Sequence, residues 1–260
     1  MNDSKNPIGL FDSGIGGTSI WKEINSLLPN EDTIYLADSK HAPYGQKNKD
    51  EIIELSIKNT EFLLNQNCKL IVVACNTATT NAIKELRERY DVPFIGIEPA
   101  IRPAALQTKT NTIGVLATKG TLNSVLFHKT VSSYSNLTII EQVGNGLVQL
   151  IEDGKLGSVE IDSLLKTYLT PMLKANIDCL VLGCSHYPYL VPQIKKRLPK
   201  SLKIIDSGEA VAKQTKNILE INSLINKSLQ KGKHTFYTNT NINVLEKILG
   251  TEHKIVNKDF

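Results

Sequence analysis

Long hydrophobic runs are missing from this chain of 260 residues. Its apolar stretches fall far short of the ~20 residues that a helix needs to cross a bilayer. The first seven residues are polar and lack the apolar centre of a secretory signal. We therefore expect a cytoplasmic protein that makes no membrane contact. A content of 41% hydrophobic and 22% charged residues is ordinary for a folded protein, and the length favours two domains over one.

Arginine is scarce, since only four of the 30 basic residues are arginines. The lysines are dispersed along the chain and are not gathered with aromatic residues into a basic stripe. The formal net charge is +4. Dispersed lysines are typical of a solvated surface, whereas a nucleic-acid interface gathers its basic residues on one face. The sequence therefore predicts no nucleic-acid partner.

Cysteine is also scarce, with four residues at Cys68, Cys75, Cys179 and Cys184. Six residues separate the first pair and four separate the second, spacings that fit neither a zinc knuckle nor a redox pair. No H-x-x-x-H pattern and no carboxylate cluster offers metal ligands. Thiols in the cytoplasm stay reduced. We therefore expect no bound metal and no disulfide.

A glycine-rich segment, residues 12–18, follows a short apolar strand at residues 8–11. A phosphate-binding G-x-G-x-x-G loop would require glycine at Ser19, and the Asp12 carboxylate would repel a phosphate. The alternative is a tight turn from strand to helix, which glycine permits because it has no side chain. We favour this turn and expect it to direct Asp12 and Ser13 into a cleft.

The rest of the chain is organised around an apolar run, residues 70–74, which ends abruptly at Cys75 and continues with Asn76 and Thr77. A short run without alternation is typical of a central strand in a parallel sheet that helices cover on both faces. Ligands of such sheets bind beyond the carboxyl ends of the strands, where Cys75 lies. The run therefore predicts a buried strand that opens onto a site.

The same pattern recurs later in the chain. An apolar run at residues 179–183 ends at Cys184, which Ser185 and His186 follow, and the two cysteines are 109 residues apart (184 minus 75). Two further segments recur at nearly this offset, residues 8–14 at 113–121 and residues 92–100 at 202–210. Three matches in order indicate an internal duplication of an α/β unit.

The duplication predicts an α/β fold with two pseudo-symmetric, three-layer domains, mainly parallel sheets, and the active site in the cleft between them. The first domain is predicted to be discontinuous, residues 1–97 plus 208–260, and the second to span residues 98–207. The second unit is complete after the strand that begins at Leu202, so we expect the remaining tail to pack back onto the first half. The tail itself is predicted to form a strand, a helix and a strand, at residues 234–237, 243–249 and 254–256.

Two thiols that face each other across a cleft can invert a stereocentre. One thiolate removes a proton from a carbon while the other thiol donates a proton to the opposite face. The pKa of a cysteine starts at about 8.5, and neighbouring groups can bring it toward the working pH. Asp12 and His186 are candidate proton relays, because they lie close to Cys75 and Cys184 respectively. Cys68 and Cys179 precede or begin their strands and are predicted to be packing residues.

Other thiol chemistries fit less well. A phosphatase of the C-x5-R type needs arginine six residues after its nucleophile, where this chain has Asn81 and Leu190. A papain-like or amidase site uses one thiol with a distant histidine. Pyridoxal phosphate is not required if two thiols transfer the protons. The remaining histidines show no pairing and are expected at the surface or in loops: His41, His128, His234 and His253.

Four segments carry a resemblance to a known family: residues 11–17, 37–45, 73–78 and 182–188. With these motifs the chain resembles the glutamate racemases, cofactor-independent enzymes that supply D-glutamate for bacterial peptidoglycan. The resemblance covers nearly the whole chain. It implies that the protein racemises L-glutamate to D-glutamate by a two-base mechanism, with no cofactor and no metal. We expect it to act as a homodimer.

The resemblance also implies the roles of single residues. Cys75 and Cys184 would be the two catalytic bases, and Asp12, His186 and Glu152 would assist them in catalysis. The amino and carboxylate groups of the substrate would lie against nine residues: Asp12, Ser13, Tyr44, Gly45, Asn76, Thr77, Thr118, Ser185 and His186.

Two alternatives stay open. An aspartate or hydantoin racemase, or a maleate isomerase, shares two cysteines but not the combination of Asp-Ser-Gly-x-Gly-Gly with Pro-Tyr-Gly. A two-lobed protein that binds a small acid without catalysis would place its ligand in the same cleft.

Overall fold

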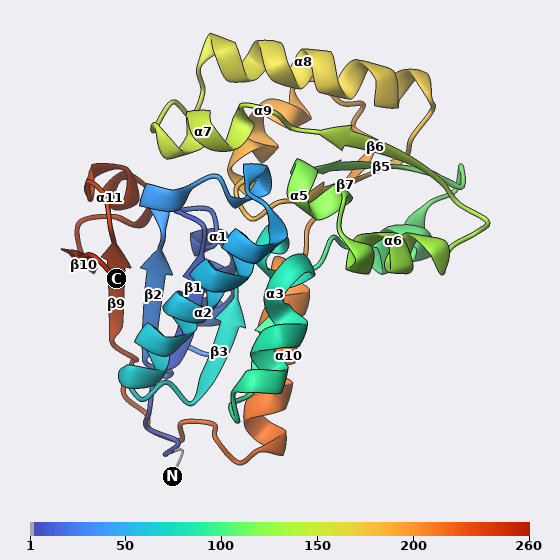
Figure 1. The fold of residues 1–260 in the computed structure, drawn as a ribbon. Coiled ribbons are helices and arrows are strands. Elements are labelled where there is room, and N and C mark those ends of the chain that lie inside the picture. The colour runs from blue at the N-terminus through green and yellow to red at the C-terminus, as the bar shows by residue number, and fades with distance from the viewer. Residues whose placement is uncertain (1–2) are drawn as a thin grey trace.

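The computed structural model describes residues 3–260, and its first feature is a six-stranded sheet with the strand order β10-β9-β2-β1-β3-β4 (Figure 1). All of its strand pairs are parallel. The six strands are β1 (Ile8–Asp12), β2 (Thr33–Ala37), β3 (Leu70–Val73), β4 (Phe94–Gly96), β9 (His234–Thr238) and β10 (Lys254–Asn257).

A second parallel sheet has four strands in the order β6-β5-β7-β8. They are β5 (Thr112–Ala117), β6 (Thr138–Val143), β7 (Cys179–Gly183) and β8 (Lys203–Ile205). This order repeats the order β2-β1-β3-β4 of the first sheet, with each strand replaced by the one that lies four places later in the chain. The predicted α/β fold with two similar, parallel-sheet halves is therefore confirmed.

Helices cover the sheets and complete two lobes. The first lobe consists of the six-stranded sheet with α1 (Thr18–Leu27), α2 (Lys49–Asn65), α3 (Asn76–Arg89), α10 (Gly208–Ile221) and α11 (Asn243–Leu249), and with the short 3-10 turns η1 (Ser39–His41) and η2 (Tyr44–Gln46). The second lobe consists of the four-stranded sheet with α4 (Ile101–Gln107), α5 (Lys119–Leu122), α6 (Val125–Ser132), α7 (Leu147–Glu152), α8 (Val159–Lys174), α9 (Val191–Lys195) and the turn η3 (Tyr187–Leu190).

The composition of β3 explains why it is buried on both faces. Successive side chains of a strand point to opposite faces of its sheet. Leu70 and Val72 pack in a core that includes residues of α1 and α10, whereas Ile71 and Val73 pack in another core with residues of α2 and α3. Both faces need apolar side chains, so the strand reads as a continuous apolar run.

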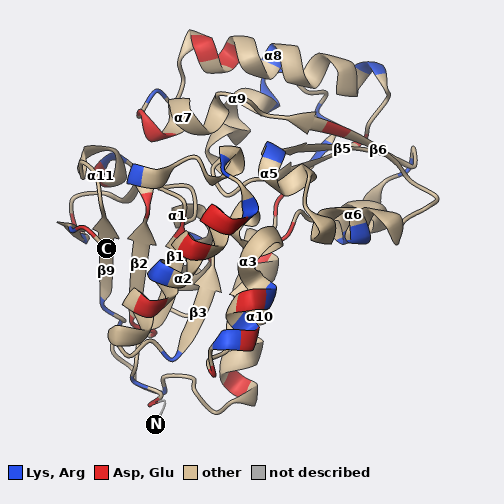
Figure 2. Ribbon diagram, viewed as in Figure 1, with Lys and Arg blue, Asp and Glu red and all other residues tan. Residues whose placement is uncertain are grey.

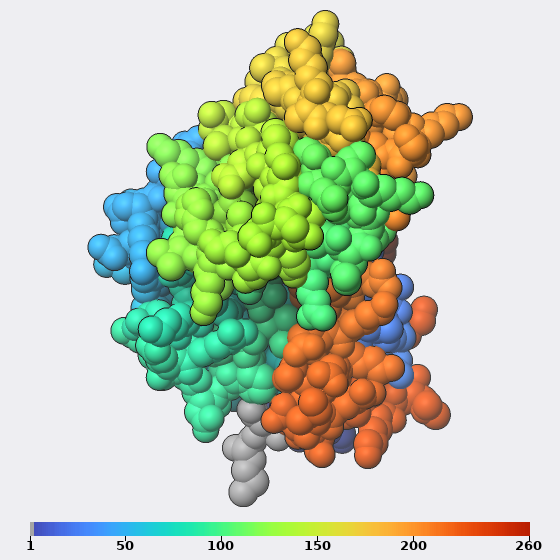
Figure 3. Space-filling view, turned by 90° about the vertical axis from the view of Figure 1, so that its right-hand side faces the viewer, coloured from blue at the N-terminus to red at the C-terminus, as the bar shows by residue number. Residues whose placement is uncertain are grey.

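The C-terminal tail returns to the first lobe, as the sequence predicts. Strands β9 and β10 extend the first sheet beyond β2, and α10 packs beside α1. In Figure 3 the orange and red C-terminal segments share the lower part of the molecule with N-terminal segments, and the green to light orange residues form the upper part. Every strand falls within the predicted domain ranges, while the boundaries at residues 97 and 207 stay a prediction.

Charged residues of both signs are interspersed over the helices, and the central strands carry few of them (Figure 2). Over residues 3–260, no helix combines the length and the apolar character needed to span a bilayer.

Candidate active site

Cys75 lies at the junction between β3 and α3. It forms the N-cap of α3, where the backbone N–H of Ala78 donates to its Sγ at 3.5 Å. The Sγ atom also lies 3.7 Å from the hydroxyl of Ser13, which follows β1. The parallel neighbours β1 and β3 end at the same edge, so their terminal residues meet. The first thiol is therefore held entirely by residues of its own lobe.

Cys184 occupies the equivalent place after β7. Its Sγ lies 3.8 Å from Nδ1 of His186, two residues further along the chain. Both thiols are buried, and both line one small cavity between the lobes. The structure thus brings the two predicted cysteines to a single small space. Its lining consists of Ser13, Pro43, Tyr44, Gly45, Cys75, Asn76, Thr77, Thr118, Val148, Cys184, Ser185 and His186.

A much larger and more open groove runs between β8, α9 and α10. Its lining contains surface lysines and carboxylates such as Lys203 and Asp206 but no cysteine or histidine. Proton transfer at carbon needs groups that can be brought near neutral pKa. The smaller cavity with the two thiols is therefore the candidate active site.

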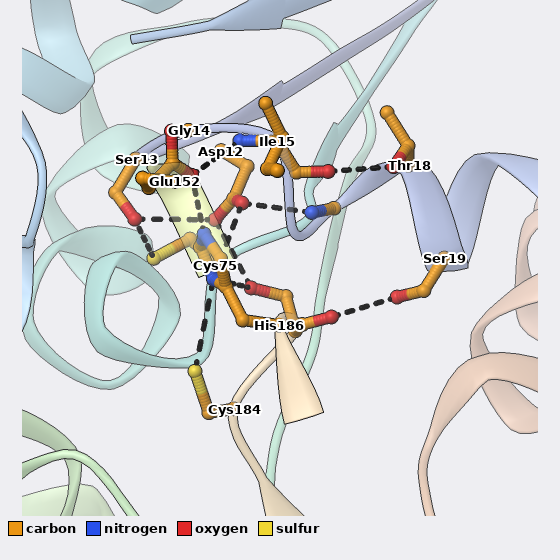
Figure 4. Close-up of polar contacts among 12 residues, drawn as sticks. Asp12, Ser13, Gly14, Ile15, Thr18, Ser19, Cys75, Glu152, Cys184 and His186 are labelled. Carbon is orange, nitrogen blue, oxygen red and sulfur yellow. Dashed lines mark hydrogen bonds and ion pairs between the residues drawn. The ribbon is translucent and has the colours of Figure 1, made fainter. Parts of the chain in front are cut away.

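His186 stands between two carboxylates (Figure 4). Its Nε2 lies 2.5 Å from Oε1 of Glu152, and its Nδ1 lies 4.0 Å from Oδ2 of Asp12. Asp12 ends β1, where its Oδ2 accepts the backbone N–H of Gly17 at 2.7 Å and its Oδ1 accepts the hydroxyl of Ser185 at 3.2 Å. Two backbone N–H groups of the turn at residues 12–18 are thus used by carboxylates of the protein itself, those of Asp12 and Glu152.

Burial and the neighbouring polar groups together set the protonation of this cluster. Burial raises the pKa of the Asp12 carboxyl, although the charge of His186 and the Gly17 N–H oppose the effect. Burial by itself lowers the pKa of His186, but hydrogen bonds with Cys184 and Glu152 and the charge of Asp12 raise that pKa well above its usual value. We infer that His186 is an imidazolium at neutral pH.

The first thiol has a different electrostatic setting. Burial, reinforced by the negative charge of Asp12, raises the pKa of Cys75 well above its usual value, although the Ala78 N–H and Ser13 favour the thiolate. Without a ligand, Cys75 is therefore a neutral thiol at physiological pH. A positively charged group in the cavity would favour its thiolate form.

Tyr44 is fixed by an anionic partner that the sequence interpretation missed. Its hydroxyl donates to Asp38 and accepts the side-chain N–H of Asn59 at 3.1 Å, so its proton is already committed to Asp38. The Asp38 carboxylate also lies 2.6 Å from Nδ1 of His41 and accepts the Asn239 amide at 2.6 Å. The expectation that His41 is unpaired was therefore wrong.

The remaining predicted residues line the cavity where the lobes meet. The hydroxyls of Thr77 and Thr118 are 2.8 Å apart across the lobes, and Gly45 packs against Thr118. Asn76 donates to the Ile97 carbonyl at 3.4 Å, while its buried Oδ1 has no hydrogen-bond partner among residues 3–260. This orphaned acceptor could be satisfied by a donor on a ligand.

Two predicted site residues do not line the cavity: Asp12 is fully buried beside it, and Glu152 lies behind His186. Besides Asp38, no site role was predicted for Pro43 and Val148, which line the cavity, or for Ser39, whose hydroxyl donates to Glu152 at 2.7 Å. A signal for Ser39 was present. Asp-Ser stands at the end of a strand at residues 12–13, 38–39 and 206–207, and only the first pair was expected to enter a cleft.

The other two cysteines lie in the cores. Cys68 is buried beneath Gly9, and burial raises the pKa of its thiol to about 12. Cys179 begins β7, and burial raises its pKa to about 11. All four thiols are free, and within the described residues no three His, Cys, Asp or Glu side chains gather as metal ligands.

Two similar α/β lobes that each bring a thiol to a shared cavity are the arrangement expected of an enzyme that transfers protons at both faces of a small substrate. The family model described as Asp/Glu/Hydantoin racemase matches residues 8–215, and the chain belongs to this family. It is 46% identical over 227 residues to the glutamate racemase of Ectopseudomonas mendocina, covering 86% of each chain. It is therefore an isomerase.

Solved structures support the assignment. Glutamate racemase isoform RacE1 from Bacillus anthracis superposes with a TM-score of 0.89 at 32% identity, covering 99% of this chain and 98% of that one. Glutamate racemase from Francisella tularensis in complex with D-glutamate gives a TM-score of 0.86 at 32% identity, with 98% of each chain covered.

Proposed function

We propose that the protein interconverts L- and D-glutamate without a cofactor, with Cys75 and Cys184 as the two bases. The observation that carries this proposal is the shared cavity, in which the two thiols approach from equivalent strand ends of opposite lobes. Glutamate as the substrate is supported by the names of the relatives, one of which was solved with D-glutamate.

The proposed reaction needs one proton from each side. One cysteine thiolate takes the proton from the α-carbon, and the resulting carbanion becomes planar. The other thiol then donates its proton to the opposite face, which yields the mirror image and leaves that sulfur as a thiolate. His186 with Glu152 assists Cys184, and Asp12 with Ser13 assists Cys75, because these groups lie within polar contact of the respective site.

The ammonium group of the substrate would serve both binding and catalysis. Asp12 and the orphaned Oδ1 of Asn76 offer acceptors for it. Its positive charge near Cys75 would lower the raised pKa of that thiol. The carboxylates of the substrate would lie against hydroxyl and amide donors, including Thr77 at the N-terminus of α3, Thr118 and Ser185.

The wider setting is also a proposal. D-glutamate made by this protein would supply peptidoglycan synthesis in the cytoplasm, and the protein would work as a homodimer without nucleic acid. The opposite signs of charge mixed over its helices support the absence of a nucleic-acid footprint (Figure 2).

The test is circular dichroism of the purified protein with L-glutamate in deuterated water and no added cofactor. We expect the optical signal to decay to zero and deuterium to enter the α-carbon, with loss of both effects in Cys75→Ser and Cys184→Ser. Parallel assays with L-aspartate and a hydantoin distinguish the other activities of the family. Binding of glutamate without deuterium incorporation would instead establish a non-catalytic binding protein.

A further inference from the structure

The Glu152 carboxylate receives two donors from the opposite lobe. The Ser39 hydroxyl, which follows β2, donates to Oε2 at 2.7 Å, and the backbone N–H of Ile15, which follows β1, donates to Oε1 at 2.7 Å. Glu152 itself ends α7 of the second lobe, and its side chain is only 8% exposed. Figure 4 shows Ile15 and Glu152 on the far side of His186 from Cys184. The carboxylate is therefore oriented by contact between the lobes.

Through one imidazole, this contact leads directly to Cys184. Glu152 holds Nε2 of His186 at 2.5 Å, and Nδ1 of the same ring lies 3.8 Å from Cys184 Sγ. Cys75, in contrast, contacts Ser13 and the Ala78 N–H, both from its own lobe. The contact between the lobes thus reaches Cys184 through Glu152 and His186, while the immediate hydrogen-bond partners of Cys75 come from its own lobe.

We propose that Ser39 is a positioning residue for proton transfer at Cys184. It acts through Glu152 and does not line the cavity. Without its hydroxyl, the carboxylate keeps only the Ile15 donor and can rotate, which loosens the imidazole that it holds. The inference rests on the proposed racemisation and adds that the two thiols respond differently to the contact between lobes.

The readout must distinguish the two proton transfers, and rates alone do not. Enantiomers have equal free energy in water, so any substitution changes kcat/KM by the same factor in both directions. The kinetic isotope effect measured with α-deuterated substrate is not bound to change equally for the two enantiomers. It grows when removal of the labelled proton limits the rate, and it shrinks when reprotonation from the other side limits the rate.

In Ser39→Ala we expect kcat/KM to fall about tenfold in both directions, as for the loss of one hydrogen bond to a charged group. The isotope effect should rise for the enantiomer whose proton goes to Cys184 and fall for the other. Ser39→Thr keeps the hydroxyl and should restore both values. Ser19→Ala is the matched control, because Ser19 donates to the Ser185 carbonyl across the lobes at 2.9 Å without touching Glu152.

Glu152→Gln provides a second route to the same result. As in Ser39→Ala, the isotope effect should rise for the enantiomer whose proton goes to Cys184 and fall for the other. The double variant of Ser39→Ala with Glu152→Gln should show little further change, because Ser39 acts through Glu152. Isotope effects that stay constant in Ser39→Ala, or that move together, would overturn the inference. An unmodified protein that does not racemise glutamate would instead overturn the proposed function, so the two failures are distinguishable.

Discussion

The two thiols occupy equivalent positions in the duplicated fold, yet their neighbours differ. Cys75 has a hydroxyl and a backbone N–H beside it, whereas Cys184 has an imidazole that contacts two carboxylates. The duplicated backbone therefore places the two sulfurs at equivalent positions, whereas the side chains that surround them differ between the halves. A symmetric reaction on glutamate would then be carried out by two chemically unequal bases.

His186 should contribute to stability in a pH-dependent way. Its pKa is raised above the unfolded value of about 6.5, so the stabilisation is fully present below that pH and is lost as pH rises through the folded pKa. The free-energy difference between the unmodified protein and His186→Asn should therefore be larger at pH 6 than at pH 9.5. Urea unfolding at the two pH values measures it, and a difference that grows with pH would contradict the assignment.

At the scale of elements, the segment from β2 to α2 connects the lobes at the site. Its Gly45 lies so close to Thr118 that a Cβ atom at this position would come within 2.7 Å of Thr118 Cβ. In the same segment, the Ser39 hydroxyl donates to Glu152 and the Tyr44 hydroxyl donates to Asp38. A short connection in the sequence thus sets the width of the cavity.

Gly45→Ala should impair catalysis far more than stability. The added methyl group must push Thr118 and the second lobe away, and a misplacement of about 1 Å costs roughly 100-fold in rate. The comparison is Gly157→Ala, where φ is +84° and a Cβ would meet nothing within 4 Å. That variant should lose stability through backbone strain and keep its kcat/KM. Melting temperatures and racemisation rates of both variants check the contrast.

The strands that end in cysteine could be predicted from sequence because their signals are local. An apolar run, a thiol and a polar follower identify both strand ends, and parallel topology then places them at one edge of each sheet. The contacts of Ser39, Asp38 and Glu152 depend on residues more than 100 positions apart or on a folded turn, and neither periodicity nor spacing encodes them. The contacts that loops make between the lobes therefore follow from the folded structure and could not be predicted from the sequence.

At the scale of the whole molecule, stability and chemistry occupy opposite ends of the first sheet. The cavity lies beyond the carboxyl ends of β1 and β3. At the amino end of β3, Lys69 is fully buried and its Nζ lies 2.5 Å from Oε2 of Glu31, while Oε1 of Glu31 accepts the Asn226 N–H at 2.7 Å. Lys69 also donates to the Ser4 carbonyl. One ion pair thus joins four segments that are distant in the sequence.

Lys69→Met should therefore destabilise the protein without changing its chemistry. Removal of one partner leaves Glu31 buried without a counter-charge, which costs about 3–5 kcal/mol. The double variant Lys69→Met with Glu31→Gln should recover part of that loss, because it buries no unpaired charge. The pair is separated from Cys75 by the length of β3, so kcat/KM measured well below the melting temperature should match that of the unmodified protein. A loss of activity in the folded Lys69→Met protein would show instead that the two ends of the sheet are coupled.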